Sequence, residues 1–236
     1  MYRELLEEAK TMEADLIAWR RKLHTMPELG LELPDTSTFV REKLEEMGIP
    51  YEIKVNGSCV VGILGKGSRC FMLRSDMDGL PFQEESGEEF ASRNGRMHAC
   101  GHDLHATVLL GAARLLKQHE SELKGQVKLL FQPGEETFQG ARQPLRKACW
   151  TIQRWTAPSP CMWQPRCPRN MLPTEAFPWR GVYGFRITLT GQGGHGSRPE
   201  KCIDPINTGV HVYLALQELI ARECPAISET ALTIGQ

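Results

Sequence analysis

A cluster of metal-binding residue types lies between residues 98 and 105. The segment His98-Ala-Cys-Gly-His-Asp-Leu-His105 holds one thiol, three imidazoles and one carboxylate, and such ligands suit a borderline-soft divalent ion. Cys100 and His102 are the predicted ligands. His98, Asp103 and His105 could support them from behind, although His105 could also be an ordinary first-turn helix residue. No second pair follows at zinc-finger spacing, so a structural finger is not expected.

Two adjacent carboxylates could complete this chemistry. Glu135 and Glu136 follow an apolar run and a Pro133-Gly134 turn. Like charges so close repel, which favours them where a cation compensates them or where one must hold a proton. We therefore predict that one carboxylate binds metal while the other moves a proton from metal-bound water to the leaving amine. Without the Cys/His cluster, the pair would be interpreted as solvated surface residues.

Asp76 and Asp78 are further candidates. They follow an apolar run in Arg74-Ser-Asp-Met-Asp-Gly-Leu-Pro81, and sheets of alternating strands and helices deliver such residues to a crevice at the strand ends. A solvated loop explains this segment equally well when it is taken alone. The prediction for both aspartates is therefore a supporting role.

Helical and strand-like segments alternate around these motifs. Charged and apolar residues at helical spacing predict an N-terminal helix, then a second helix that Asp35 or Thr36 caps and Gly48 ends. The remaining expected elements are strands at about 51–55, 59–64, 70–74 and 126–131 and a helix at about 105–118. This alternation predicts an α/β fold.

A separate α+β unit is expected near the other end of the chain. Residues 182–190 alternate like a half-buried strand, and Asp204-Pro205 can open a helix that runs to about Glu223. Three histidines lie outside the motifs. His24 and His211 fall in predicted helices and are interpreted as structural, and His119 as a solvated helix-end residue.

Composition argues against several classes of protein. The net charge is −1, from 28 basic and 29 acidic residues without a block of like charge, so nucleic acid is not an expected partner. The N-terminus lacks the apolar core of a signal peptide, and no run of eighteen apolar residues occurs. No membrane association and a cytoplasmic location are therefore predicted. The eight cysteines show no framework spacing, so most are expected to be free thiols.

Four ordered motifs resemble the aminoacylase and carboxypeptidase-G-like dinuclear metallopeptidases. They are Asp-Met-Asp-Gly-Leu-Pro, His-Ala-Cys-Gly-His-Asp-x-His, Gln-Pro-Gly-Glu-Glu and Gly-Gly-His-Gly-Ser-x-Pro. The resemblance is to the N-acyl amino acid amidohydrolase branch, which includes hippurate hydrolases and auxin-conjugate hydrolases. It covers about 20–141 and 182–236. It implies a zinc-exopeptidase-like catalytic domain with helices around a mixed sheet, and hydrolysis of N-acyl amino acids such as hippurate-like substrates.

The resemblance also implies residue roles. By position Cys100, His102 and Glu136 would be metal ligands and Glu135 the general base that acts on metal-activated water. Two divalent ions would be bound, and the mixed ligand set suits zinc, manganese or cobalt alike. His195, between Gly194 and Gly196, would belong to an inserted lid domain that often forms a homodimer. It would stabilise the oxyanion, a contribution of ~3 kcal/mol to the barrier in comparable sites.

One stretch departs from the family pattern. Residues 142–180 hold four of the five tryptophans, seven of the fifteen prolines, no histidine and a single carboxylate. Relatives carry Met-His-Val-Ala here, with another metal-binding histidine. ATG-CAT-GTG-GCA read one base later gives Cys-Met-Trp and a codon beginning CA, which matches Cys161-Met-Trp-Gln164. We therefore expect two compensating frame changes, either in the gene or as sequencing errors, with the frame restored at about Val182.

The expected organisation has three parts. Residues 1–141 would be the N-terminal part of the catalytic domain, 142–181 a frame-shifted irregular segment, and 182–236 a partial lid and dimerisation domain. Relatives continue beyond the equivalent of Gln236 to a last metal-binding histidine. The alternatives to an active amidohydrolase are therefore an inactive fragment or pseudoenzyme, and a dimerisation module.

Overall fold

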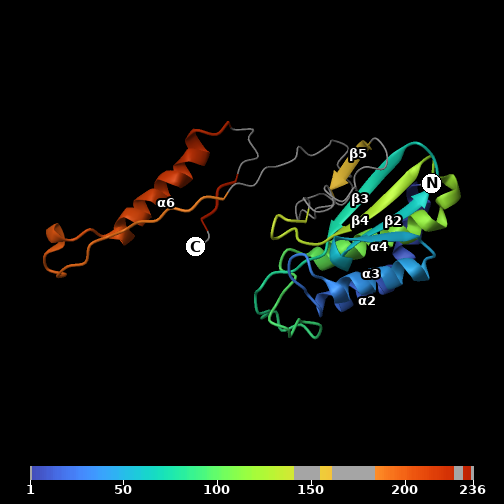
Figure 1. The fold of residues 1–236 in the computed structure, drawn as a ribbon, viewed down its shortest axis with the longest axis horizontal. Helices are drawn as coiled ribbons and strands as arrows, with labels where there is room; N and C mark the ends of the chain where they lie inside the picture. The colour runs from blue at the N-terminus through green and yellow to red at the C-terminus, as the bar shows by residue number, and fades with distance from the viewer. Residues whose placement is uncertain (1, 141–154, 161–183, 226–230, 235–236) are drawn as a thin grey trace. The chain divides into compact units, whose positions relative to one another are not determined.

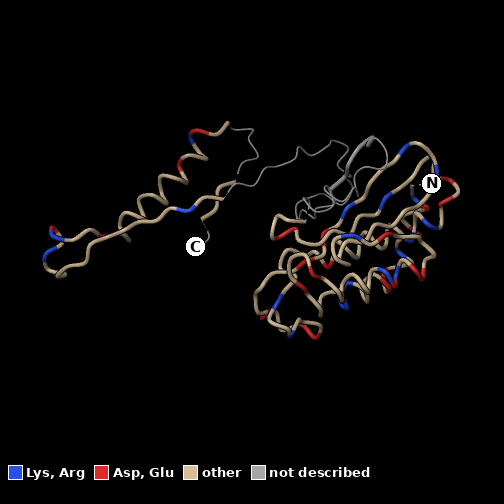
Figure 2. The backbone as a smooth tube through the Cα atoms, in the orientation of Figure 1, with Lys and Arg blue, Asp and Glu red and all other residues tan. Residues whose placement is uncertain are grey.

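The computed structural model describes residues 2–140, 155–160, 184–225 and 231–234 (Figure 1). The chain divides into two compact units, Met1–Pro178 and Trp179–Gln236. Most of the segment predicted to be frame-shifted, including Cys161 to Gln164, lies outside the described residues. Its described part, Trp155–Pro160, is a strand, whereas the sequence predicted no regular structure there. Acidic and basic residues are interspersed along the first unit (Figure 2).

The first unit begins with three helices. They are α1 (Tyr2–Thr11), α2 (Glu13–His24) and α3 (Pro34–Glu46). The single N-terminal helix predicted from the sequence is therefore two helices. The break falls at Met12, whose side chain is buried, so the junction packs into the protein.

The start of α3 corrects one prediction. Neither Asp35 nor Thr36 caps the helix. The carboxylate of Glu28 instead accepts hydrogen bonds from their backbone N–H groups, at 3.2 and 2.8 Å. A carboxylate supplied from before the helix satisfies the same free donors as a side-chain cap and also favours the positive end of the helix dipole. Gly48, with φ +65°, follows the end of the helix as predicted.

A mixed five-stranded sheet forms the centre of this unit. Its order is β1-β2-β4-β3-β5, with antiparallel β1/β2 and β2/β4 pairs and parallel β3/β4 and β3/β5 pairs. The predicted α/β class with a mixed sheet is confirmed. The strands are β1 (Tyr51–Lys54), β2 (Cys59–Gly65), β3 (Cys70–Asp76), β4 (Gln126–Gln132) and β5 (Trp155–Pro160).

Strand alternation divides the sheet's side chains between two faces. Val60, Leu129 and Phe131 face the main core with the apolar sides of α3 and α4 (His102–Gln118). Val61 and Leu130, one residue along from Val60 and Leu129, belong to a smaller cluster. The main core therefore fixes the sheet against α4, and α4 carries His102 at its first position.

The parallel pair β3/β4 brings separate motifs to one edge of the sheet. Asp76 pairs in register with Gln132, so both strands end together. The aspartate loop after β3 and the Pro133-Gly134 turn after β4 therefore leave the sheet side by side. Gly134 has φ +70°, and a Cβ there would lie 2.7 Å from Leu31 Cδ2, so the turn requires glycine.

Helix α4 begins three residues earlier than predicted. Gly101, with φ +80°, precedes it, and His102 is its first residue. The error arose because the apolar periodicity begins only at about His105, whereas the first turn carries polar side chains. His102 and Asp103 consequently have helical geometry.

The second unit contains the short helix η3 (Pro199–Lys201) and helix α6 (Pro205–Arg222). Asp204 caps α6 as predicted, accepting from the backbone N–H groups of Ile206 and Asn207 at 2.9 and 3.1 Å. The predicted strand at 182–190 is wrong for its described part, 184–190. There, no strand pairs with it among the described residues, and only Gln192 and Ile203 form an isolated bridge nearby.

Candidate metal centre

One ring nitrogen of His102, Nδ1, is fixed by a hydrogen bond, and the other, Nε2, remains available to bind an ion. Its Nδ1 lies 2.7 Å from the carbonyl oxygen of Asp78, which can only accept, so Nδ1 must donate. In the neutral ring this leaves the lone pair on Nε2, the nitrogen nearer Glu135 and Glu136. A backbone acceptor that fixes the tautomer is typical of a metal-binding histidine.

Three predicted ligands come together at this nitrogen. The ligand atoms of Cys100, His102 and Glu136 all lie within 4.8 Å of one another. His102 is buried, Glu136 is half-buried and Cys100 is exposed. Glu136 Oε1 is buried without a hydrogen-bond partner among the described residues. Nitrogen, sulfur and oxygen donors around an unsatisfied carboxylate oxygen fit a divalent ion.

Asp78 holds the two glutamates in place. Its Oδ1 accepts from the backbone N–H of Glu135 and its Oδ2 from that of Glu136, both at 3.0 Å. The backbone carbonyl of the same residue fixes His102. One aspartate thus connects the loop after β3, the turn after β4 and the start of α4.

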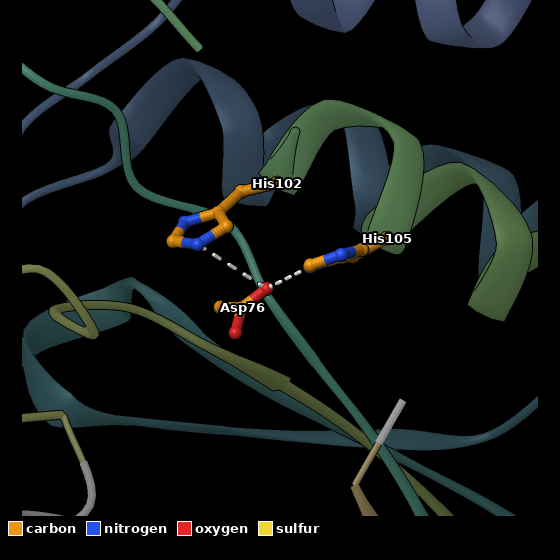
Figure 3. Close-up of side chains that lie close together, drawn as sticks. All are labelled: Asp76, His102 and His105. Carbon is orange, nitrogen blue, oxygen red and sulfur yellow. Dashed lines mark hydrogen bonds and ion pairs between the residues drawn. The ribbon is translucent and has the colours of Figure 1, made fainter. Parts of the chain in front are cut away.

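Asp76 and His105 form a buried pair beside the centre. His105 Nδ1 lies 2.5 Å from Asp76 Oδ1, and His102 Nε2 lies 3.7 Å from the same oxygen (Figure 3). Asp76, His102 and His105 could also hold an ion. His102 Nδ1 already donates a hydrogen bond to the carbonyl of Asp78. An ion held with Asp76 and His105 and an ion held with Cys100 and Glu136 would therefore both need His102 Nε2 as a ligand. Arg74 Nη1, 3.3 Å from Asp76 Oδ2, already offsets part of the charge in the Asp76 group.

Excess negative charge at the centre shows in the pKa values of the ligands. Burial would lower the pKa of His102, but its hydrogen bond to Asp78 and the charges of Asp76 and Asp78 raise it to about 9. Loss of hydration, together with the hydrogen bond and charge of Glu136, raises the pKa of the Cys100 thiol to about 12. Without a metal ion, His102 and Cys100 therefore keep protons that a bound cation would displace.

Glu135 has the properties of a proton carrier. Its Oε2 lies 3.9 Å from His102 Nε2, and its side chain is one-third exposed. Burial raises its pKa, and the charge of Asp76 adds to the effect. A carboxylate with a raised pKa accepts and returns a proton near neutral pH more effectively than a carboxylate with an ordinary pKa. Asp76 behaves oppositely: burial acts to raise its pKa, but the His105 hydrogen bond and nearby cations hold that pKa low.

The other two supporting candidates make no hydrogen bond to Cys100 or His102 among the described residues. Asp103 Oδ2 accepts from Arg20 Nε at 2.8 Å and lies 2.7 Å from His24 Nδ1. His98 is buried, and neither ring nitrogen has a hydrogen-bond partner among the described residues. Burial lowers its pKa to about 4. In this structure neither side chain orients Cys100 or His102 by a hydrogen bond that the described residues show.

His195 belongs to the second unit. Its Nδ1 accepts from the backbone N–H of Ser197 at 3.2 Å and lies 2.8 Å from the Ser197 hydroxyl. A Cβ at Gly194 would lie 2.4 Å from Cys202 Sγ, so this glycine allows close packing within its own unit. Around Gly196 there is open space. His195 is exposed.

Sequence reasoning missed several residues that shape the site. Arg74 donates through Nε to Gln132 Oε1 at 3.0 Å and so links two motifs beneath the centre. Both residues lie in the sequence segments that carry predicted site residues, 74–81 and 132–136. This position was the signal in the sequence that could have indicated their role. His24 and Glu84 are also missing from the prediction. They are 60 positions apart in the sequence, and no local pattern connects them.

Comparison with known proteins gives a consistent result. The model of peptidase family M20/M25/M40 matches residues 72–199. An IAA-amino acid hydrolase of Arabidopsis thaliana, ILR1-like 2, is 38% identical over 238 residues, covering 99% of this chain and 54% of the relative. An N-acyl-L-amino acid amidohydrolase of Geobacillus stearothermophilus is 36% identical over 242 residues, covering 99% and 63%.

The fold is also similar to solved structures. The Bacillus subtilis YXEP protein, a dinuclear metal binding peptidase from the M20 family, superposes with a TM-score of 0.63 at 36% identity. The match covers 67% of this chain and 45% of that protein. The chain spans about half the length of the Arabidopsis relatives that it matches. None of the described helices is both long and apolar enough to cross a membrane.

Proposed function

Because the chain belongs to peptidase family M20/M25/M40, as its motifs predicted, we propose that its metal centre serves the hydrolysis of N-acyl amino acids. The observation that carries the proposal is the convergence of Cys100, His102 and Glu136, with ligand atoms within 4.8 Å of one another. The relatives named as N-acyl-L-amino acid amidohydrolase and IAA-amino acid hydrolase support the substrate class. Hippurate-like amides are the substrates to test first.

In the proposed mechanism each residue has one role. Cys100, His102 and Glu136 would hold a divalent ion, which would polarise the amide carbonyl and acidify water. Glu135 takes a proton from the attacking water and returns it to the leaving amine, so that the amide C–N bond breaks to a carboxylate and a free amine. His195, offered by a second copy of the chain, would donate a hydrogen bond to the carbonyl oxygen as negative charge develops there.

The ligand set limits what the described residues can hold. Both candidate groups depend on His102, so these residues offer one ion site at a time. A second ion, as in the dinuclear Bacillus relative, would require ligands from elsewhere. Zinc, manganese and cobalt all accept such mixed donors. A free thiol ligand favours a reducing compartment, so a cytoplasmic location is part of the proposal.

We also propose that residues 142–181 are translated out of frame. The match to the Arabidopsis relative extends over 99% of this chain, which supports flanking segments that remain in register. The test is to sequence the gene through the codons for 135–185. A shifted frame that restores a histidine-containing segment would support the proposal. Codons without such a frame would refute it.

A dimerisation module is the second candidate. Large apolar side chains of α6 are exposed, including Ile206 at 78%, Val210 at 52% and Leu214 at 53%. These three lie at helical spacing on one face. A homodimer formed through 182–236 would cover them, with or without turnover at the first unit.

The direct test is amide hydrolysis by the full chain. The protein would be incubated with zinc, manganese or cobalt and with hippurate, N-acetyl amino acids or indole-acetyl amino acids, and free amino acid would be measured. We expect release that a chelator abolishes. Metal binding without release from any substrate would contradict the hydrolase proposal and favour an inactive relative.

A further inference from the structure

A second buried polar network lies behind the metal centre. His24 on α2 lies between two carboxylates, with Nδ1 2.7 Å from Asp103 Oδ2 and Nε2 3.0 Å from Glu84 Oε1. All three residues are buried, with exposures of 7% or less. Arg20 Nε also donates to Asp103 Oδ2, at 2.8 Å. None of these residues belongs to the ligand cluster.

Glu84 organises the long loop between β3 and α4. Its Oε2 accepts from the backbone N–H of Ser92 and its Oε1 from the Ser86 hydroxyl, both at 2.6 Å. Within residues 77–101, the β-type backbone pairing among the described residues consists of isolated bridges, such as the one between Leu80 and Met97. The loop therefore depends on side-chain hydrogen bonds for its shape, and Cys100 lies at its end.

Asp103 lies on the other side of His24. It is the second residue of α4, directly after His102, whose Nδ1 is already fixed by Asp78. His24 thus ties the loop that ends in Cys100 to the helix turn that carries His102. Phe90 of the same loop packs edge-on against the His24 ring at 5.5 Å, which adds a second contact at this point.

We propose that His24 is a positioning residue that clamps this loop onto the start of α4 and thereby sets the separation of Cys100 Sγ and His102 Nε2. The consequence for metal binding rests on the proposed function, but the clamp itself does not. Without the His24 ring, two buried carboxylates would lose a shared partner, and the loop would lose its connection to the helix.

Two conservative variants each remove one of the two hydrogen bonds that join the His24 side chain to a carboxylate. His24→Asn keeps a donor near the position of Nδ1 and loses the reach to Glu84. His24→Gln keeps a donor near the position of Nε2 and loses Asp103. His119→Gln is the matched control, because His119 also bridges two carboxylates, Glu122 and Glu8, each at 2.8 Å. That bridge is partly exposed and holds no ligand loop.

Amide hydrogen exchange of the metal-free full chain tests the clamp. We expect peptides from 84–101 to exchange about tenfold faster in both His24 variants, as loss of a hydrogen bond to a charged group implies. Peptides from 126–131 and the control variant should match the wild type. Glu84→Gln, which keeps the shape of the side chain, replaces any His24 variant that fails to fold. Loop exchange within twofold of wild type would overturn the clamp.

Cobalt binding tests the consequence for the centre. A thiolate-to-cobalt absorption band reports on Cys100, and the His24 variants should bind cobalt 10- to 100-fold more weakly, with an altered band, as losses of supporting residues do. If a His24 variant exchanges faster in the 84–101 loop but keeps the wild-type cobalt band and affinity, the positioning role of His24 is overturned. If the wild type shows no band, the proposed metal site is wrong, whereas the exchange experiment still decides the clamp.

Discussion

Two neighbouring glutamates at the centre have different surroundings. Glu136 places an oxygen in the ligand cluster, 3.8 Å from His102 Nε2. Glu135 lies at its edge, partly exposed and with a raised pKa. Asp78 holds the backbone of both, so the two side chains extend from a fixed turn. This arrangement supports one ligand and one base.

Replacing the proposed base should separate chemistry from binding. Glu135→Gln keeps the size of the side chain but cannot accept the proton, so we expect turnover to fall about 10²- to 10⁴-fold. Metal affinity should stay within threefold. The measurements are amino acid release and cobalt titration of the same preparation, with Glu136→Gln as the contrasting variant that weakens metal. Undiminished turnover would remove Glu135 from the base role.

The raised pKa values predict how metal binding depends on pH. In the metal-free chain His102 titrates at about 9 and Cys100 at about 12, so both are protonated at neutral pH. Binding must displace both protons, and affinity therefore rises with pH by about two log units per pH unit below 9. Calorimetry in buffers of different ionisation enthalpy should show about two protons released. Release of only about one proton would contradict the thiolate ligand, because His102 alone accounts for one.

At the scale of elements, adjacent strand ends create the site. Parallel pairing of β3 with β4 brings Asp76 level with Gln132, and the core holds α4 so that His102 faces the same edge. The sequence predicted β1 to β4 well because apolar runs and turns mark them locally. It placed the helix start late, because the first turn of α4 is polar and only the fold reveals that it is buried.

The cap of α3 offers a stability test at this scale. Glu28→Ala removes the acceptor for two backbone N–H groups, so the free energy of unfolding should fall by about 1–2 kcal/mol. Urea unfolding measures the difference. Glu32→Ala is the control, since Glu32 is exposed nearby. Equal stability of the two variants would show that the carboxylate of Glu28 does not act as a cap.

At the scale of the whole molecule, the clustering of the candidate ligands could be predicted, but the network behind them could not. Cys100, His102 and Glu136 occur in dense local motifs, and the structure gathers them as the sequence suggested. The contact between His24 and Glu84 joins residues far apart in sequence and depends on the packing of α2 against α4. The strand expected at 182–190 failed for a related reason, since alternation alone cannot supply a pairing partner.

The exposed face of α6 predicts self-association. We expect sedimentation to show a concentration-dependent dimer of the full chain. Val210→Glu places a charge on the apolar face and should weaken the dimer at least about tenfold. Ala215→Glu adds the same charge on the opposite side of the helix and should have little effect. Equal behaviour of the two variants would remove this face from the interface.

Cobalt titration of the full chain is the direct test of the metal centre. We expect saturable binding with a thiolate-to-cobalt band that disappears in Cys100→Ser and persists in Cys224→Ser, whose altered cysteine lies in the second unit. A band that survives in Cys100→Ser, or a wild-type chain that binds no cobalt, would contradict a metal centre built on Cys100, His102 and Glu136.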